Sequence, residues 1–424
     1  MAEMKLHRPG LLTKMLIGVA VGCLLGMTGP LFGIQENPVF EMVIRTLVTF
    51  SSLFAQFLRF IVPLLIVSFI GVGLAELGRR ANKLFGVTLL LSYVFTVIAG
   101  LIAVAVGLTC LPGLIQPITG EAGAQIEYAP LLDLKFDPVM PVLTSLILAF
   151  VIGLGMANLR GGKLLAIMSD VRDIIALVIN KIIIPVIPWF MVALFANIAA
   201  SGELVSTVGI FLTLFLFIIV FQWIILLVEY GVASAYTKQN QLKKIKNALP
   251  AYVTALGTKS SAATIPINME CASKNGTSKE VAGFVIPLCA NIHLVGDAVC
   301  LTFEAVGIML AFGMNPGLGE MIPFVLMLGL MMVAAPGVPG GGVMAALGLF
   351  TGPLGFSEAM AQIAISLHLT QDSFGTACNV TGDHAISFMV EEYDKKHSTP
   401  EDLAEQAALE AAEGPRVEIE AQEL

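Results

Sequence analysis

The last apolar stretch of the chain carries polar residues whose types can bind a cation, a proton or a charged small molecule. They recur at intervals of four, three, four and four residues: His368, Asp372, Gly375, Asn379 and Asp383. An α-helix places this spacing on one face. Each charged group costs about 2.5–3.5 kcal/mol or more in a membrane helix, and this face holds no Lys or Arg. The carboxylates are therefore expected to face a cation or a substrate, the alternative being a hydrogen-bond network between helices.

A second polar group lies within an earlier apolar stretch, where His293, Gly296 and Asp297 follow one another. Gly296 is expected to mark a break in this helix. The group is interpreted as an ion or proton site, the alternative being a kinked helix with an internal His–Asp pair. An imidazole titrates near neutral pH and can carry a proton. The candidate proton carriers are His293, Asp297, Glu304 and His368.

Two further segments offer groups that suit a small zwitterion. Residues 259–264 combine hydroxyls with the free N–H groups of a predicted helix start, which favour a carboxylate. Lys259 adds a positive charge there. It can be a counter-ion to Asp372 or Asp383, or it can contact a substrate, and both roles are open. The Gly- and Pro-rich residues 335–342 let the backbone approach a ligand closely and are interpreted as a gate.

These residues must be held by helices that cross a membrane. Of the 424 residues, 57% are hydrophobic and 13% are charged, whereas soluble domains carry about a quarter charged residues. Four charge-free stretches are long enough to cross a hydrocarbon core about 30 Å thick: residues 15–34, 84–120, 138–159 and 204–228. The net charge of −8 arises mainly from residues 398–424, where eight acids stand against Arg416. No basic surface for nucleic acid is expected.

The distribution of basic residues predicts the topology. Lys and Arg cluster in five places, near residues 5–14, 79–83, 160–163, 238–246 and 395–396. Because positive loops stay in the cytoplasm, both termini are expected there, with six spans between about residues 10 and 236.

Two segments are expected to enter the membrane and return on the same side. Residues 247–277 begin and end inside, because Lys274 and Lys279 at the end of this segment are basic. The arm 322–335 spans roughly 21 Å, too short to cross. Two re-entrant helical hairpins of opposite orientation, each followed by a span, form an inverted repeat, and such repeats surround substrate sites in transporters. The alternative is a pair of ordinary spans with kinks, which would contradict the predicted topology twice.

In their order and spacing, the motifs at 259–266, 337–342, 371–373 and 379–383 resemble those of the dicarboxylate/amino acid:cation symporter family. The similarity extends from about Leu11 to Lys396. It implies a homotrimer in the cell membrane (inner or plasma), in which a scaffold holds a mobile transport domain that works by an elevator motion.

The resemblance also implies roles by position. Ser260 and Ser261 would contact the substrate carboxylate together with Asn379, and Asp372 would take the α-amino group. The full set assigned to an amino acid substrate is Ser260, Ser261, Val338, Pro339, Gly340, Asp372, Gly375, Thr376 and Asn379. Asp383 and Asn379 would hold a sodium ion, to which Asp297 could contribute a ligand.

Two departures from the family pattern bear on substrate and ion. Relatives that carry acidic amino acids place an arginine at the position of Gly375 or in the first hairpin tip, whereas Gly375 is expected to leave space and no charge. This favours a small neutral, serine- or threonine-like substrate over glutamate or aspartate. In the family's Asn-Met-Asp-Gly-Thr motif, Val295 replaces the aspartate, so one sodium site is expected to be lost or rebuilt.

The sequence thus predicts an all-α polytopic membrane protein with eight transmembrane helices and two re-entrant hairpins. The expected divisions are scaffold helices 1–2 (1–82), transport-domain helix 3 (83–120), an outer loop with scaffold helices 4–5 (121–203), helix 6 (204–246), hairpin 1 (247–278), broken helix 7 (279–319), hairpin 2 (320–356), helix 8 (357–396) and an acidic cytoplasmic tail (397–424). The predicted function is sodium-driven amino acid import. The alternative is proton-coupled symport of an amino acid or a dicarboxylate. No nucleophile–base signature indicates an enzyme.

Overall fold

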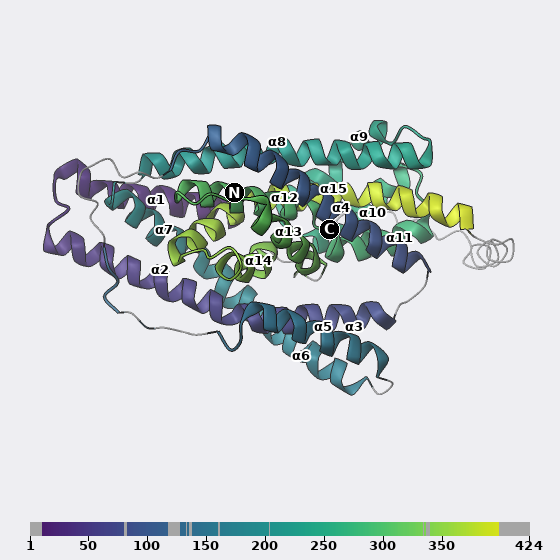
Figure 1. The fold of residues 1–424 in the computed structure, drawn as a ribbon, viewed down its shortest axis with the longest axis horizontal. Coiled ribbons are helices and arrows are strands. Elements are labelled where there is room, and N and C mark those ends of the chain that lie inside the picture. The colour runs from purple at the N-terminus through teal and green to yellow at the C-terminus, as the bar shows by residue number, and fades with distance from the viewer. Residues whose placement is uncertain are drawn as a thin grey trace, which may run out of the picture.

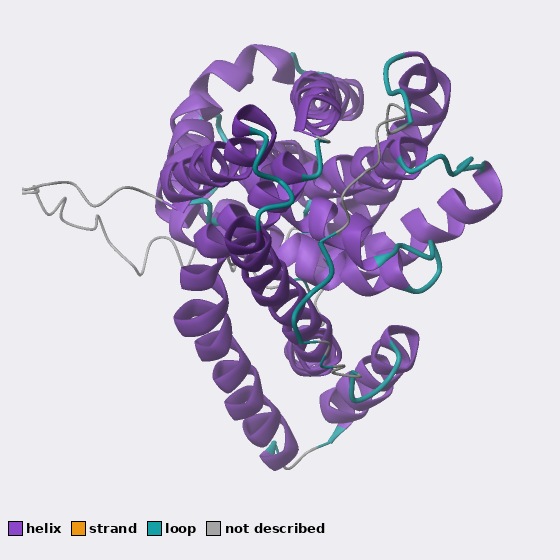
Figure 2. Cartoon of the chain, turned by 90° about the vertical axis from the view of Figure 1, so that its left-hand side faces the viewer, coloured by secondary structure: helices purple, strands orange, loops and turns teal. Residues whose placement is uncertain are grey.

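The structure is a computed structural model that describes residues 11–79, 83–117, 128–132, 134, 138–159, 162–202, 204–333, 335 and 340–397. These residues form helices and connecting loops, and no strand occurs among them (Figure 2). The α-helices are α1 (Leu11–Phe32), α2 (Pro38–Leu65), α3 (Gly71–Arg79), α4 (Lys83–Cys110), α5 (Val142–Asn158), α6 (Lys163–Val178), α7 (Ile184–Ala200), α8 (Leu204–Thr237), α9 (Ile245–Thr258), α10 (Ser261–Lys274), α11 (Lys279–Ile292), α12 (Val295–Ala311), α13 (Leu318–Met332), α14 (Gly341–Thr351) and α15 (Glu358–His397).

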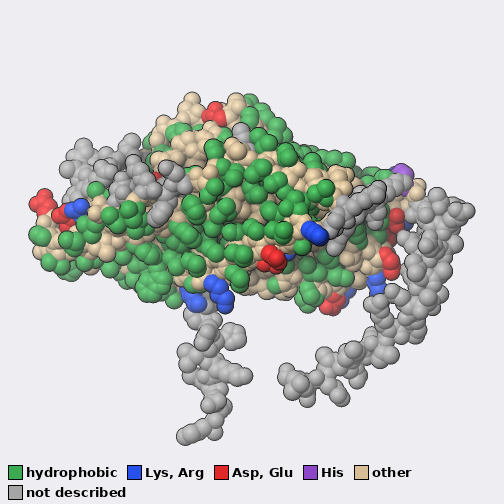
Figure 3. Space-filling view, turned by 90° about the horizontal axis from the view of Figure 1, so that it is seen from below, with side chains coloured by type: hydrophobic (Ala, Val, Ile, Leu, Met, Phe, Trp, Pro, Cys, Tyr) green, Lys and Arg blue, Asp and Glu red, His purple; other side chains and the backbone are tan. Residues whose placement is uncertain are grey.

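Six stretches within the described residues are helical, long and apolar enough to cross a membrane. They are Thr13–Phe32, Pro38–Ala75, Leu84–Gly113, Lys163–Ala200, Thr207–Thr237 and Lys279–Ala311. Hydrophobic side chains cover most of the described surface that Figure 3 shows. Helices of this kind identify a membrane protein, because lipid tails solvate an apolar surface and water does not.

Two predicted spans do not meet the same criterion. Helix α5 has 17 residues, which is at the lower limit of a span. Helix α15 has 40 residues but carries the stripe of acids and histidines, which lowers its hydropathy. The total of eight membrane helices therefore stays a prediction.

Two pairs of short helices form helical hairpins. Helices α9 and α10 have 14 residues each, roughly 21 Å, and pack against each other. The chain reverses at Lys259, which has a left-handed φ of +53°, and at Ser260, whose hydroxyl caps α10. Helices α13 and α14 form the second pair, with 15 and 11 residues. None of the four helices is long enough to cross a bilayer alone, so the predicted re-entrant geometry is sterically possible for both pairs.

The predicted position of the break in the seventh span is wrong. The helix is interrupted at His293 and Leu294, and Gly296 already belongs to α12. Gly296 is instead needed for close packing, because a Cβ there would lie 2.5 Å from the carbonyl oxygen of Gly375 in α15. The glycine lets α12 and α15 touch through their backbones.

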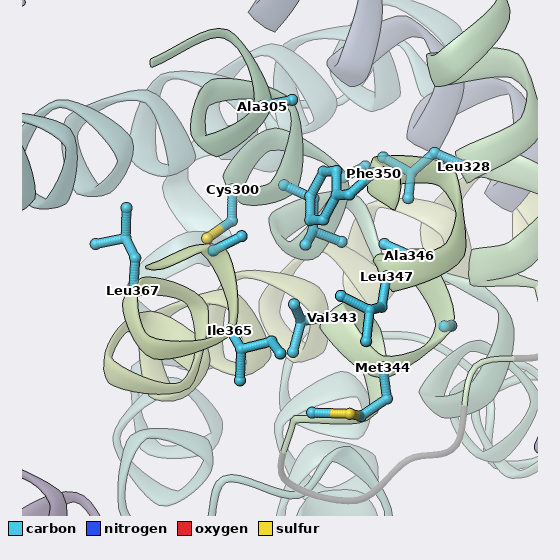
Figure 4. Close-up of a cluster of buried hydrophobic side chains, with 14 of the residues drawn as sticks. Cys300, Ala305, Leu328, Val343, Met344, Ala346, Leu347, Phe350, Ile365 and Leu367 are labelled. Carbon is cyan, nitrogen blue, oxygen red and sulfur yellow. The ribbon is translucent and has the colours of Figure 1, made fainter. Parts of the chain in front are cut away.

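Helix α15 is the centre of the fold. It packs against α8, α9, α10, α11, α12 and α14 (Figure 1). Val343 and Leu347 of α14 face Ile365 of α15 in an apolar cluster (Figure 4). The polar stripe of α15 is thus enclosed by both hairpins and by the broken helix. The predicted division into scaffold and transport domains is not tested by this arrangement.

Candidate substrate and cation site

His293, at the break between α11 and α12, connects two carboxylates from different helices. Its Nε2 lies 3.0 Å from Oε1 of Glu229 in α8, and its Nδ1 lies 3.1 Å from Oδ1 of Asp383 in α15. All three side chains are at most 1% exposed. Asn268 of α10 donates its amide to Oδ2 of Asp383 over 3.3 Å and to the carbonyl of Val380. We call Glu229, His293 and Asp383 the first triad.

The first triad must hold a proton beyond that of a neutral histidine. A neutral imidazole has one N–H and one acceptor nitrogen. Both nitrogens of His293 lie within hydrogen-bond distance of a carboxylate oxygen. Two donors are required to satisfy both contacts, so either the imidazole is positively charged or one of the carboxyl groups is protonated. The arrangement can therefore store and release a proton.

His368 of α15 lies between two acids of α12 in a similar way. Its Nδ1 is 3.3 Å from Oε2 of Glu304, and its Nε2 is 3.6 Å from Oδ1 of Asp297. We call Asp297, Glu304 and His368 the second triad. Cys300 donates its thiol to the other oxygen of Glu304 over 3.2 Å.

The second triad differs from the first because its contacts are not hydrogen bonds. Among the described residues, both nitrogens of His368, Oδ1 of Asp297 and Oε2 of Glu304 are buried without a hydrogen-bond partner. The separations fit ion pairs, and the 3.6 Å contact with Asp297 is longer than a hydrogen bond. Buried polar groups are nearly always hydrogen-bonded, so several atoms here are available to a ligand.

Asn379 connects α15 to the start of α12. Its Oδ1 accepts the backbone N–H of Gly296, and its Nδ2 donates to Oδ2 of Asp297, both over 2.7 Å. This amide was expected to contact the substrate carboxylate and sodium. One N–H of its amide is not used in these two bonds, and both expected roles stay predictions.

The two hairpins meet at Asp372. The backbone N–H of Gly340, at the start of α14, donates to Oδ2 of Asp372 over 3.3 Å. From the first hairpin, the ammonium of Lys259 donates to the carbonyl of Leu369, one turn before Asp372, over 3.4 Å. Lys259 and Asp372 are both buried. Of the other predicted tip residues, Ser261 is buried at the start of α10, and Val338 and Pro339 lie outside the described residues.

The remaining predicted contacts on α15 lie within the same buried region. Thr376 donates its hydroxyl to the carbonyl of Asp372 over 2.8 Å. The expectation that Gly375 leaves empty, uncharged space is wrong. A Cβ at this position would lie 2.9 Å from Oδ1 of Asp297, so a carboxylate from α12 fills the space.

Sequence reasoning missed two members of this region, Glu229 and Asn268. Both reach Asp383 or its partner from helices distant in the chain. An isolated acid directly after an apolar stretch of 25 residues is the only local signal for Glu229, and Asn268 has none.

The atoms around the predicted sodium ligands are mainly donors. Asp383 faces Nδ1 of His293 and the amide N–H of Asn268, and Asp297 faces the amide N–H of Asn379. Hard cations prefer oxygen ligands with free lone pairs.

Short paired helices and a broken helix, packed around buried acids and histidines in an apolar helical bundle, define a transporter of small solutes. The chain belongs to the sodium:dicarboxylate symporter family, whose sequence model matches residues 11–393.

Curated relatives agree with this membership. The chain is 23% identical over 401 residues to the serine/threonine transporter SstT of Bifidobacterium adolescentis, covering 88% of this chain and 87% of the relative. It is 30% identical over 160 residues to an excitatory amino acid transporter of Caenorhabditis elegans, covering 38% and 32%. It is 27% identical over 291 residues to human excitatory amino acid transporter 2, covering 64% and 49%. The prediction that the chain is not an enzyme is confirmed, because these relatives are transporters.

Proposed function

We propose that this protein is a secondary active symporter that imports a small neutral amino acid together with protons. The observation that carries the proposal is the meeting of both hairpins at Asp372, where Gly340 donates to the carboxylate and Lys259 binds one turn away. A single bound molecule can contact both hairpins and α15 there, as coupling of binding to a conformational change requires.

The chemistry of the site suits a zwitterion. Asp372 is the partner for the α-ammonium group. The start of α10, with Ser260, Ser261 and Lys259, offers hydroxyls, orphan N–H groups and a positive charge to the α-carboxylate. A dicarboxylate is disfavoured, because it has no cation for Asp372. The name of the bacterial relative, a serine/threonine transporter, supports a small hydroxyl-bearing substrate.

The proton is favoured as the coupling ion because both oxygens of Asp383 in the first triad are already contacted by nitrogen atoms of the protein. His293 contacts one oxygen of Asp383 and Asn268 contacts the other, and a shared proton would satisfy both contacts of the imidazole. The second candidate is sodium coupling through Asp383, Asn379 and Asp297. The description of the family as sodium:dicarboxylate symporters favours it.

The proposal includes the architecture inferred from the sequence. The two helical hairpins re-enter the membrane from opposite sides, both termini are cytoplasmic, and the protein forms a homotrimer in the cell membrane in which the transport domain moves as an elevator. The short lengths of α9, α10, α13 and α14 support the re-entrant geometry.

Uptake into proteoliposomes tests substrate and ion together. Radiolabelled serine is supplied under an inward proton gradient without sodium, or under an inward sodium gradient at equal pH. We expect accumulation in the first case. Accumulation only in the second case would establish sodium coupling, and no accumulation of serine or alanine under either gradient would refute symport of small neutral amino acids.

A further inference from the structure

Oδ1 of Asp297 is a buried acceptor that receives no hydrogen bond from any described residue. Asp297 is 6% exposed, and its other oxygen, Oδ2, is bound by Asn379. Within the part of the chain that the structure describes, Oδ1 has no hydrogen-bond partner, and neither has the nearby Nε2 of His368, 3.6 Å away. An unpaired buried carboxylate oxygen is costly, so a donor is expected there in the working cycle.

Glycines of two neighbouring helices make room for this carboxylate. A Cβ on Gly375 of α15 would lie 2.9 Å from Oδ1. A Cβ on Gly342 of α14 would lie 3.3 Å from Cγ of Asp297 and 3.4 Å from Nε2 of His368. The carboxylate therefore stands between α15 and the tip end of the second hairpin, which are two of the three walls of the proposed substrate site.

The carboxylate of Asp297 is also close to Asp372, the proposed partner of the α-ammonium group. Carboxylate oxygens of Asp297 and Asp372 and a ring nitrogen of His368 lie within 4.8 Å of one another. In an amino acid with a donor on Cβ, that donor lies about 3–4 Å from the α-nitrogen, as bond lengths and staggered torsions require. One such molecule can reach both carboxylates at once.

We propose that Asp297 selects the substrate by accepting a hydrogen bond from a hydroxyl or ammonium group on the Cβ of the substrate. The inference rests on the proposed amino acid symport. An alanine molecule would leave Oδ1 unpaired, and an acidic side chain would be repelled by it. A site that hydrogen-bonds a substrate group discriminates strongly against analogues that lack the group.

The test compares ligands that differ at Cβ alone. Dissociation constants are measured by calorimetry on the full-length protein in detergent for L-serine, L-2,3-diaminopropionate, L-alanine and L-aspartate. We expect serine or diaminopropionate, or both, to bind at least about tenfold more tightly than alanine, as a hydrogen bond to a charged acceptor provides. Aspartate should bind most weakly. The relative strength of the first two ligands tells whether the selected donor is a hydroxyl or an ammonium group.

Two variants test whether the preference for donor-bearing ligands depends on Oδ1 of Asp297. In Asp297→Asn an amide N–H replaces the free acceptor, so the preference for the donor-bearing ligand over alanine should fall below about threefold. Gly375→Ala should reduce the same ratio by displacing Oδ1, without changing Asp297. Glu270→Gln, at an exposed carboxylate paired with Lys274, is the matched control and should keep the ratio of the unmodified protein.

The outcomes separate the two proposals. Equal affinities for serine, diaminopropionate and alanine in the unmodified protein would overturn the selective role of Asp297 and leave amino acid symport intact. A preference that persists in both Asp297→Asn and Gly375→Ala would also overturn it. If the unmodified protein binds none of these amino acids, the proposed function itself fails, and this inference fails with it.

Discussion

Nδ1 of His293 lies 3.1 Å from Oδ1 of Asp383, although 90 residues separate the two in the chain. On its other side, the same imidazole reaches Glu229. A cationic or proton-sharing ring therefore stands beside the carboxylate that the family resemblance assigns to a metal ion. The negative charge of Asp383 can thus be neutralised by the imidazole of His293 instead of a bound cation.

Removal of the imidazole should destabilise the protein. His293→Ala leaves Glu229 and Asp383 buried without their shared partner, which typically costs about 3–5 kcal/mol. We expect a marked loss of thermal stability, measured by the unfolding of the purified protein in detergent. Adding Glu229→Gln to this variant removes one of the two carboxylates and should restore part of the loss. A double variant less stable than His293→Ala would contradict the shared-proton interpretation.

Sodium removal should have little effect on binding. With Asp383 engaged by His293 and Asn268, replacing sodium by choline should change the dissociation constant for serine less than about twofold. By linkage, removal of a co-bound ion that is needed for binding would raise the dissociation constant for serine by about 5- to 150-fold. Calorimetric titrations at constant ionic strength measure this. A tenfold weakening in choline would instead support the sodium site at Asp383, Asn379 and Asp297.

Loss of the charge on Asp372 should abolish substrate binding. Asp372→Asn keeps an acceptor for the N–H of Gly340 but removes the negative charge opposite the α-ammonium group. Truncating one partner of a buried charge pair costs about 2–5 kcal/mol, so affinity should fall by about 100-fold or more. Glu392→Gln, at the partly exposed end of the same helix, provides the control. Serine binding at the affinity of the unmodified protein would exclude Asp372 as the amine site.

Backbone contact between α12 and α15 gives a prediction about packing. Gly296→Ala places a Cβ 2.5 Å from the carbonyl of Gly375, so a helix must shift. Overpacking of this kind typically costs about 1–3 kcal/mol. Gly283→Ala in α11 is the matched control, since its Cβ would meet only the end of Met269 at 3.8 Å. Thermal unfolding should show a clear loss for Gly296→Ala and little change for Gly283→Ala; equal stabilities would refute the contact.

Local periodicity predicted that His368, Asp372, Asn379 and Asp383 lie on one face of a helix. All four belong to α15 and are buried, but so is nearly every residue between Met360 and Val390, so burial does not distinguish this face. His368 and Asp383 contact different acids and histidines. Periodicity within one helix predicts a shared face because 3.6 residues complete a turn. Composition likewise predicted the all-helical membrane fold, since long apolar stretches in lipid must satisfy their backbone hydrogen bonds internally, as a helix does.

The partners across helices could not be predicted from the chain. Glu229 and Asn268 join Asp383 only because α8 and α10 pack against α15. The glycines show the same limit. Gly296 was interpreted as a helix breaker and Gly375 as empty space, but each is explained by an atom of another helix that occupies the place of its Cβ. Long-range packing, and not local propensity, determines both positions.

The glycines around Asp297 also have a mechanical consequence. Because Gly342 lies in the first turn of α14 and stands directly against Asp297 and His368, movement of α14 away from α12 would uncover those groups. If the second hairpin is the gate that the sequence predicts, its opening would be coupled to hydration of the second triad. A ligand that satisfies Oδ1 of Asp297 would favour the closed hairpin, and by reciprocity a closed hairpin would raise the affinity for that ligand.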